Sequence, residues 1–304
     1  MFDVPVVVIC FNRINEVRKL MAVLQEVKPR ELFVISDGPR PNVPDEKEKV
    51  DKVRSFVENP NWDCVVHKDY ANENMGCDQR VTSGLDKVFS VVDRAIIFED
   101  DCIPDRSFFP YCQELLDRYT DEDRVKYIAG SNQIDTFPIE ESYIFTINGW
   151  TLGWATWARA WNRRIDLDRE WSGIKPLLMR YKRYSLYERY QLCKTIDLYH
   201  KRGMIPWDFT FTTSVLLQDG FSIVPRSNLV VHIGFNEDAT HVSEAFPGYR
   251  AETVPMEFPL IHPSEIREKK GYHRAAYLWH RETIPQKLVS PAFYKRQIKR
   301  LLKR

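Results

Sequence analysis

The chain has 304 residues, of which 43% are hydrophobic, and its 44 lysine and arginine residues balance 43 aspartate and glutamate residues. A chain of this length and apolar content can bury a substantial core, in one large domain or two modest ones. The net charge of +1 excludes a basic footprint for nucleic acid over the whole surface, so no nucleic-acid partner is expected.

The cysteines and the amino-terminal segment bear on the compartment. The six cysteines show neither CxxC pairs nor the density of a disulfide framework, which favours a reducing environment. The apolar run from Val4 to Cys10 follows Asp3 without a basic segment, and no stretch is long enough to cross a bilayer. We therefore expect a cytoplasmic protein.

Short β-branched runs alternate with helical patterns in the amino-terminal third. The pattern predicts strands and helices in alternation, the strands at 5–10, 31–35, 64–67 and 95–98 and the helices at about 15–27, 45–58 and 78–90. Repeated strand–helix units are typical of a parallel sheet that helices cover on both faces. The predicted fold class is therefore α/β, with a mostly parallel central sheet flanked by helices.

Polar residues follow three of these predicted strands. Asn12-Arg13 follow the first strand, Asp37-Gly38 follow the second, and Glu99-Asp100-Asp101 follow the fourth. Ligands of such sheets bind outside the carboxyl ends of the strands. We expect these side chains to gather on one rim of the sheet.

The run Glu99-Asp100-Asp101 places three carboxylates directly after an apolar strand. Adjacent acids repel one another, and a hard divalent cation with oxygen ligands relieves that repulsion. Mn²⁺ or Mg²⁺ held by one or two carboxylates shares its other positions with water and substrate phosphates. The cluster therefore indicates a nucleotide-linked substrate. The alternative is an acidic loop that caps the helix beginning near Phe108.

Beyond about Lys126 the pattern becomes mixed and reads as the second half of the same domain. It predicts strands at 126–129, 143–147 and 221–224 and helices near 177–200 and 208–218. Four tryptophans lie between 150 and 161. We expect Trp157 and Trp161 in the core, and Trp150 and Trp154 in a pocket wall, because sugar rings prefer flat aromatic platforms.

Four short sequence segments, in this order, resemble those of GT-A-fold glycosyltransferases that use nucleotide sugars. The resemblance is closest to the N-acetylglucosaminyltransferase I-like family with its Glu-Asp-Asp motif. The segments are Phe11-Asn12-Arg13, Ser36-Asp37-Gly38, the helix at 84–89 leading into Glu99-Asp100-Asp101, and Leu152-Gly153-Trp154 leading to Trp207-Asp208. The resemblance implies a GT-A (Rossmann-like) catalytic domain at 1–245, with a nucleotide-binding half at about 1–125 and an acceptor half at about 126–245. Residues 246–304 would form a carboxyl-terminal extension.

The resemblance also implies roles for the acidic residues. Asp101 would bind the metal, Asp100 would contact the ribose or the donor sugar, and Glu99 would support them. His241, in a loop that would close over the donor, could complete the metal coordination or touch the diphosphate. The alternative for a lone histidine is a purely structural residue.

Three further positions match the family's nucleotide contacts. Arg13 and Asp37 would hold the nucleobase and ribose, and Arg80 lies on the helix that approaches the nucleotide. An aspartate accepts hydrogen bonds from uracil or ribose, and an arginine offers a planar fork of donors to phosphate. The alternative for Arg13 and Arg80 is a solvated charge at a helix end. Position 80 also departs from the family, because better-known relatives carry another side chain there.

Transfer from a sugar diphosphate requires a base that removes a proton from the acceptor hydroxyl. Asp208 matches the family's catalytic aspartate, and in-line attack with one carboxylate base inverts the anomeric centre. The alternative is that Asp208 only caps its helix. Glu237 and Asp238 are reserve candidates.

The carboxyl-terminal segment 291–304 contains no acid and forms a basic amphipathic pattern. This pattern suits contact with an anionic membrane, which would make the protein peripheral on the inner face of the membrane and favours a lipid-linked glycan over a free glycan as acceptor. The alternatives are a helix packed on its own domain and a solvated tail.

Two competing functions stay open. A sugar nucleotidyltransferase would need a glycine-rich phosphate loop after the first strand, where the chain reads Phe11-Asn12-Arg13-Ile14-Asn15 without glycine. A non-catalytic carbohydrate-binding or assembly subunit could keep the same fold without turnover.

Overall fold

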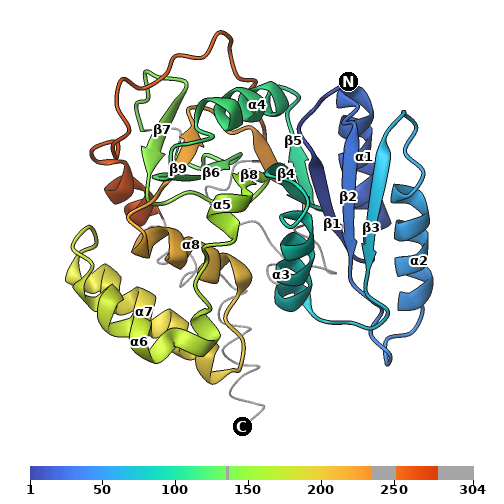
Figure 1. Cartoon of the computed structure of the whole chain (residues 1–304), viewed down its shortest axis with the longest axis horizontal. Helices are drawn as coiled ribbons and strands as arrows, with labels where there is room; N and C mark the ends of the chain where they lie inside the picture. The colour runs from blue at the N-terminus through green and yellow to red at the C-terminus, as the bar shows by residue number, and fades with distance from the viewer. Residues whose placement is uncertain (135–136, 235–250, 280–304) are drawn as a thin grey trace, which may run out of the picture.

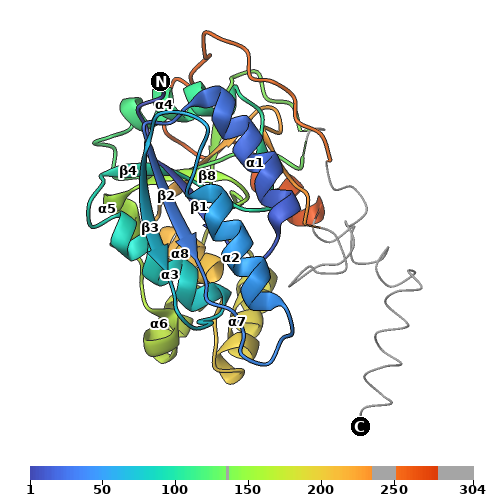
Figure 2. The same ribbon diagram turned by 90° about the vertical axis from the view of Figure 1, so that its right-hand side faces the viewer.

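The computed structural model describes residues 1–134, 137–234 and 251–279. Its centre is an eight-stranded sheet with the order β3-β2-β1-β4-β8-β6-β9-β7, and helices lie against both faces (Figures 1 and 2). The predicted α/β class with a mainly parallel central sheet is confirmed. Among the described residues, none of the helices is both long and apolar enough to span a membrane.

The amino-terminal half of the sheet is entirely parallel. Its strands are β1 (Val6–Cys10), β2 (Glu31–Ser36), β3 (Val65–Tyr70) and β4 (Arg94–Glu99). The helices between them are α1 (Ile14–Val27), α2 (Glu46–Val57) and α3 (Cys77–Val88). The strand–helix alternation predicted for this half is confirmed.

The second half of the sheet contains a strand that the sequence pattern did not predict. β8 (Trp154–Trp157) lies between β4 and β6 (Val125–Ala129) and runs antiparallel to both. β9 (Phe221–Pro225) is parallel to β6, and β7 (Tyr143–Thr146) is the antiparallel edge. Because β8 is antiparallel to both of its neighbours, β6 and β9 run in the same direction as β1 to β4.

The single helix predicted at 177–200 is wrong, because two helices occupy this region. α6 (Leu167–Arg180) ends before the turn, and α7 (Leu186–Lys201) begins after it. Ser185 and Glu188 form a capping box that starts α7, which satisfies backbone groups that a continuous helix would have bonded internally. Three further helices are α4 (Phe108–Arg118), α5 (Ala158–Trp161) and α8 (Trp207–Leu217).

Three clusters of buried apolar residues hold these layers together. One lies between the sheet and α1, α2 and α4, and a second lies between the opposite face and α3, α5 and α8. A third cluster joins α6, α7 and α8, including Trp171, Ile174, Cys193 and Ile196. The α6–α7 pair is therefore attached to α8 by this third cluster, at one edge of the described structure (Figure 1).

A two-stranded sheet brings a distant segment back to the end of β4. β5 (Cys102–Pro104) follows the acidic run directly and pairs antiparallel with β10 (Val230–His232). Further on, the buried Met256, Leu260 and Tyr272 attach residues 251–279 to the body. The predicted boundary at 245 lies outside the described residues, and the domain division stays a prediction.

The close approach of α3 to the sheet provides a test of the packing. A Cβ atom at Gly84 would lie 2.6 Å from Cγ2 of the buried Ile35. We expect Gly84→Ala to lower the free energy of unfolding by about 1–3 kcal/mol through overpacking. Urea unfolding followed by circular dichroism measures this change.

Gly173 in α6 is the matched control. A Cβ atom there would meet nothing within 4 Å, so Gly173→Ala should raise the free energy of unfolding by up to about 1 kcal/mol through helix propensity. Equal effects of the two substitutions would contradict the packing of α3 on β2.

Candidate active site at the carboxyl ends of β1 and β4

The ends of β1 and β4 lie side by side because these strands pair in parallel, with Ile9 opposite Glu99. The chain leaving β1 enters α1 after Arg13, and the chain leaving β4 continues into Asp100 and Asp101. The Arg13 guanidinium forms ion pairs with both aspartates, and its Nη1 atom lies 2.7 Å from Asp101 Oδ2. The positive charge of Arg13, at the end of β1, is thus paired with the acidic run at the end of β4. The alternative of a solvated Arg13 is therefore wrong.

His232 joins this group through the pairing of β10 with β5. The pairing sets His232 opposite Cys102, and the Ile233 N–H donates to the Asp101 carbonyl at 2.8 Å. As a result, His232 Nε2 lies 3.1 Å from Asp101 Oδ2. Sequence reasoning did not choose His232 as a site residue. The available signal was a histidine at the end of a short β-branched run, Val230–His232.

The backbone passes close to the carboxylates at Gly234. A Cβ atom at this position would lie 2.4 Å from Asp101 Oδ2 and 3.1 Å from Arg13 Nη1. A side chain at position 234 would therefore displace the ion pair, which explains the need for glycine at this close approach.

The predicted metal ligand His241 lies outside the described residues, as do the reserve bases Glu237 and Asp238. Their roles therefore stay predictions. The histidine that the structure brings to Asp101 is His232.

Burial and neighbouring charges separate the proton affinities of the three carboxyls. Burial, with repulsion from Asp101 and Asp100, raises the pKa of Glu99 to about 8. Burial also raises the pKa of Asp100 to about 6, although Arg13 opposes it. For Asp101, burial acts upward, but the hydrogen bond from His232 and the charge of Arg13 outweigh it and lower the pKa. Asp101 is therefore the carboxylate that stays ionised to the lowest pH.

Asp208 approaches the acidic cluster from the first turn of α8. Burial is the main cause of the raised pKa values of Glu99 and of the Cys77 thiol, and repulsion from Asp208 adds to both. Asp208 is thus within electrostatic reach of the end of β4. The start of α8 is held by Asp78 of α3, whose Oδ1 accepts a hydrogen bond from the Trp207 N–H at 2.8 Å.

Asp37, at the end of β2, orders the loop that precedes α3. Its Oδ1 accepts hydrogen bonds from the backbone N–H groups of Gly38 and Met75, both at 2.8 Å. Its Oδ2 accepts from the Gly76 N–H and from the Asn74 side-chain amide, both at 3.0 Å. Both oxygens already have two donors, so a direct contact of this carboxylate with a nucleobase or ribose stays a prediction.

Arg80 joins α3 to the two strands beside it. Its side chain is almost fully buried, forms an ion pair with Asp69 and donates to the Ser36 carbonyl at 3.2 Å. The alternative of a solvated helix-end charge is therefore wrong for Arg80. Its predicted contact with the nucleotide stays a prediction.

Trp154 differs from the expectation of a pocket wall, because it is only 1% exposed. Its ring packs among Trp161, Trp207 and Phe211, with the Trp207 ring stacked at a centroid distance of 5.7 Å. The antiparallel strand β8 carries this side chain into the core behind the start of α8, where it supports Trp207 instead of facing a sugar. The predicted burial of Trp161 is confirmed.

Comparisons with known proteins give distant similarities only. The sequence matches no known family model and no curated protein. Among solved structures, the chain is similar to the mannosyltransferase PcManGT from Pyrobaculum calidifontis, in complex with GDP-Man and Mn²⁺, at 13% identity and a TM-score of 0.41. The match covers 78% of this chain and 59% of the mannosyltransferase.

A second solved structure is HddC from Yersinia pseudotuberculosis, complexed with GMP-PN. It is 11% identical, with a TM-score of 0.32, and the match covers 53% of this chain and 78% of HddC.

The raised pKa of Glu99 predicts an unusual dependence of stability on pH. The folded pKa of about 8 exceeds the ordinary value of 4.5, so between these values the folded state binds more protons and stability falls as pH rises. We expect Glu99→Gln to be more stable than the parent chain at about pH 8, on the order of 1 kcal/mol, with no gain below about pH 4. Urea unfolding with a chelator present measures both.

Asp121→Asn, at an exposed position, is the control for general charge effects. If Glu99→Gln and the parent chain lost stability equally from about pH 5 to pH 8, the assigned protonation of Glu99 would be refuted.

Proposed function

We propose that this chain is a glycosyltransferase that moves a sugar from a nucleoside-diphosphate donor to a hydroxyl of a glycan or lipid-linked glycan. The main support is the group of charged side chains at the end of β4, where Arg13 and Asp101 form an ion pair with 2.7 Å between Nη1 and Oδ2 and Asp208 of α8 is within electrostatic reach. Arg13 and His232 reach the same run from two other segments. Ligands of open α/β sheets bind at this edge, so the groups converge where a donor would lie.

Asp101 and His232 fit a divalent cation with open coordination positions. The Asp101 carboxylate oxygen and the His232 imidazole nitrogen lie 3.1 Å apart, and both are ligands that Mn²⁺ accepts. Binding of the ion by both would replace the hydrogen bond between them. Within the described part of the chain, no group of three His, Cys, Asp or Glu side chains has the spacing of a closed metal site. Two protein ligands suit an ion that completes its shell with water and phosphate oxygens. Such an ion, Mn²⁺ or Mg²⁺, would stabilise charge on the departing diphosphate.

Arg13 supplies a second positive group for the diphosphate. Asp100 and Asp101 hold its guanidinium at the end of β1, so its planar donor fork is oriented before a donor arrives. Arginine binds phosphate through two parallel hydrogen bonds. Arg13 is thus a nucleotide-sugar-binding residue in this proposal, while Asp100 orients it.

Asp208 is the proposed general base. Its side chain is half-buried in the first turn of α8, close to the run that would hold the donor phosphates. A carboxylate on the acceptor side removes the hydroxyl proton as the oxygen attacks the anomeric carbon, and the sugar–phosphate bond breaks on the opposite face. This single displacement inverts the anomeric centre.

We assign the chain to the GT-A-fold enzymes, with the Glu-Asp-Asp arrangement of the N-acetylglucosaminyltransferase I-like family, and UDP as the first nucleotide to test. A panel of UDP- and GDP-sugars identifies the donor by release of the nucleoside diphosphate. Release of pyrophosphate would favour a sugar nucleotidyltransferase, and absence of turnover with every donor would favour a non-catalytic subunit.

Replacing the base separates catalysis from donor binding. We expect Asp208→Asn to lower turnover by at least about 100-fold, because general base catalysis contributes this much, while the dissociation constant of the nucleoside diphosphate is unchanged. Steady-state kinetics and calorimetry measure the two quantities. Asp121→Asn, an exposed control, should keep full turnover. Parent-like turnover in Asp208→Asn would remove Asp208 from the mechanism.

Replacing Asp101 tests the cation site independently of turnover. We expect Asp101→Asn to weaken Mn²⁺ binding in the presence of the nucleoside diphosphate by about 10-fold or more, because an ionised ligand becomes neutral. Calorimetric titration with Mn²⁺ measures this loss, and Asp105→Asn, just beyond β5, is a nearby control. Equal Mn²⁺ affinity in the parent and Asp101→Asn would reject the assignment.

A further inference from the structure

Helix α7 exposes an apolar stripe on the side away from its own core. Its inner side contributes Cys193 and Ile196 to the cluster shared with α6. Its outer side carries three large apolar residues that are about half exposed: Tyr187 at 51%, Tyr190 at 54% and Leu198 at 49%. The helix therefore presents apolar side chains on two sides.

Lysines interrupt this exposed stripe at regular intervals. Tyr187, Tyr190, Lys194, Leu198 and Lys201 are all exposed, and their spacing of three or four residues places them on one helix face. We call these five residues the α7 stripe. It combines aromatic and aliphatic groups with two cations and contains no acid.

The two acids of α7 lie beside the stripe but are already bonded. Asp197 accepts hydrogen bonds from Trp171 Nε1 at 2.8 Å and from Lys175 Nζ at 2.6 Å. Glu188 belongs to the capping box, and its Oε1 atom lies 2.7 Å from His273 Nε2. Repulsion of an anionic partner by these carboxylates is therefore reduced, and the α7 stripe has a net positive character.

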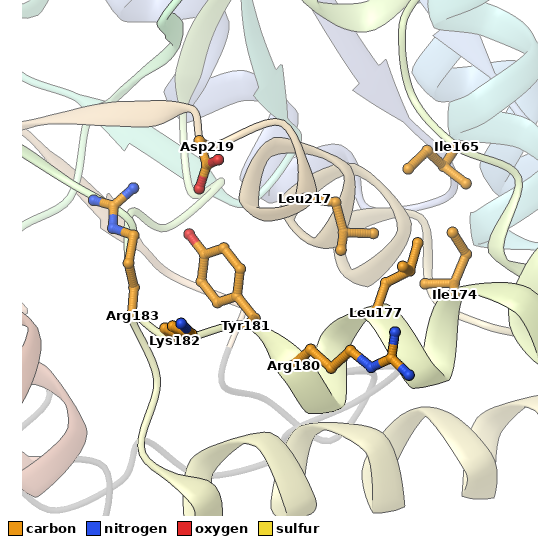
Figure 3. Close-up of a pocket in the computed structure, with 9 residues that line it drawn as sticks. All are labelled: Ile165, Ile174, Leu177, Arg180, Tyr181, Lys182, Arg183, Leu217 and Asp219. Atoms are coloured by element: carbon orange, nitrogen blue, oxygen red, sulfur yellow. The ribbon is translucent and has the colours of Figure 1, made fainter.

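The turn before α7 adds more cations and an apolar hollow. A pocket of about 480 Å³ lies between α6, α8 and this turn, and its lining includes Ile174, Leu177, Leu217, the cations Arg180, Lys182 and Arg183, and the acid Asp219 (Figure 3). Leu177 is 52% exposed. Three cations and one acid are thus mixed with apolar side chains in this pocket beside the turn.

This combination matches the interface of an anionic lipid bilayer. Tyrosine rings settle at the level of lipid headgroups, leucine side chains enter the acyl boundary, and lysines extend their ammonium groups to lipid phosphates. Each lysine near an anionic surface adds to the attraction. A protein partner would need complementary acids and a matching shape, whereas a bilayer needs only this pattern of charge and apolar surface.

The position of α7 relates this surface to the site. The chain leaves α7 at Lys201 and reaches Trp207-Asp208 at the start of α8 after a short connection in which Met204 is 50% exposed. The carboxyl-terminal end of the α7 stripe is therefore joined to the start of α8 by this short connection. Figure 2 shows α6 and α7 at the bottom of the view.

We propose that the α7 stripe docks the protein on an anionic lipid surface. The inference does not require the proposed transferase activity, because it depends only on the exposed residues of α7 and on their charge.

Co-sedimentation of the full chain with lipid vesicles tests the proposal. We expect binding to vesicles of phosphatidylcholine with phosphatidylglycerol, and much weaker binding to phosphatidylcholine alone. Lys194→Gln combined with Lys201→Gln should lower the partition coefficient by about 30-fold, which is about fivefold per lysine. Tyr187→Ser combined with Tyr190→Ser should weaken binding to the anionic vesicles as well.

Two matched double variants are the controls. Lys49→Gln with Lys52→Gln removes the same charge from exposed positions on α2, and Val65→Ser with Val91→Ser removes exposed apolar groups far from α7 in the sequence. Both should bind vesicles like the parent chain.

Three results would overturn the proposal. They are absence of binding by the parent chain, parent-like binding by the α7 variants, and equal losses in the α2 control. Sedimentation velocity without lipid adds a fourth: a parent dimer that the Tyr187→Ser and Tyr190→Ser changes dissociate would assign the stripe to contact between two copies of this chain.

Discussion

The ion pairs of Arg13 with Asp100 and Asp101 are the interaction on which the site depends. They tie the end of β1 to the end of β4, and they offset repulsion among carboxyls that have little access to water. Removing one partner of a buried pair leaves the other uncompensated, which costs far more than a surface pair is worth. The same contacts fix the guanidinium at the edge of the sheet formed by the carboxyl ends of β1 and β4.

Much of the first half of the fold could be predicted from the sequence because local pattern and tertiary structure agree there. The β-branched run at Val6–Cys10 is completely buried in a parallel sheet, and continuous apolar runs are typical of such strands. The meeting of Arg13 with Asp101 could be anticipated for a similar reason, since the carboxyl ends of neighbouring parallel strands share one edge. The sequence indicates that these polar residues share one edge, whereas the pairing of β1 with β4, which makes Arg13 and Asp101 neighbours, is a tertiary feature.

Other features depend on contacts between distant segments, and a local pattern does not contain them. His232 reaches Asp101 because β10 pairs with β5, a pairing between short strands with no strong periodicity. Trp154 is buried because β8 inserts between β4 and β6, although an aromatic after a glycine suits a pocket wall equally well. The sequence does contain a signal for the break between α6 and α7, because Ser185 and Glu188 have the spacing of a capping box. The prediction of one helix followed the apolar pattern, which continues across the break.

The reversed strand β8 has a further consequence for how the chain can be divided. β8 pairs with Ile96 and Ile97 of β4 on one side and with Ile128 of β6 on the other. Without β8, the backbone N–H and C=O groups along these edges of β4 and β6 would be unpaired. A fragment ending near 125 would retain β1 to β4 but expose a row of unpaired backbone groups along β4. Such a margin recruits strands from other molecules. The amino-terminal half would therefore self-associate in isolation, even though it contains the complete Arg13–Asp101 contact.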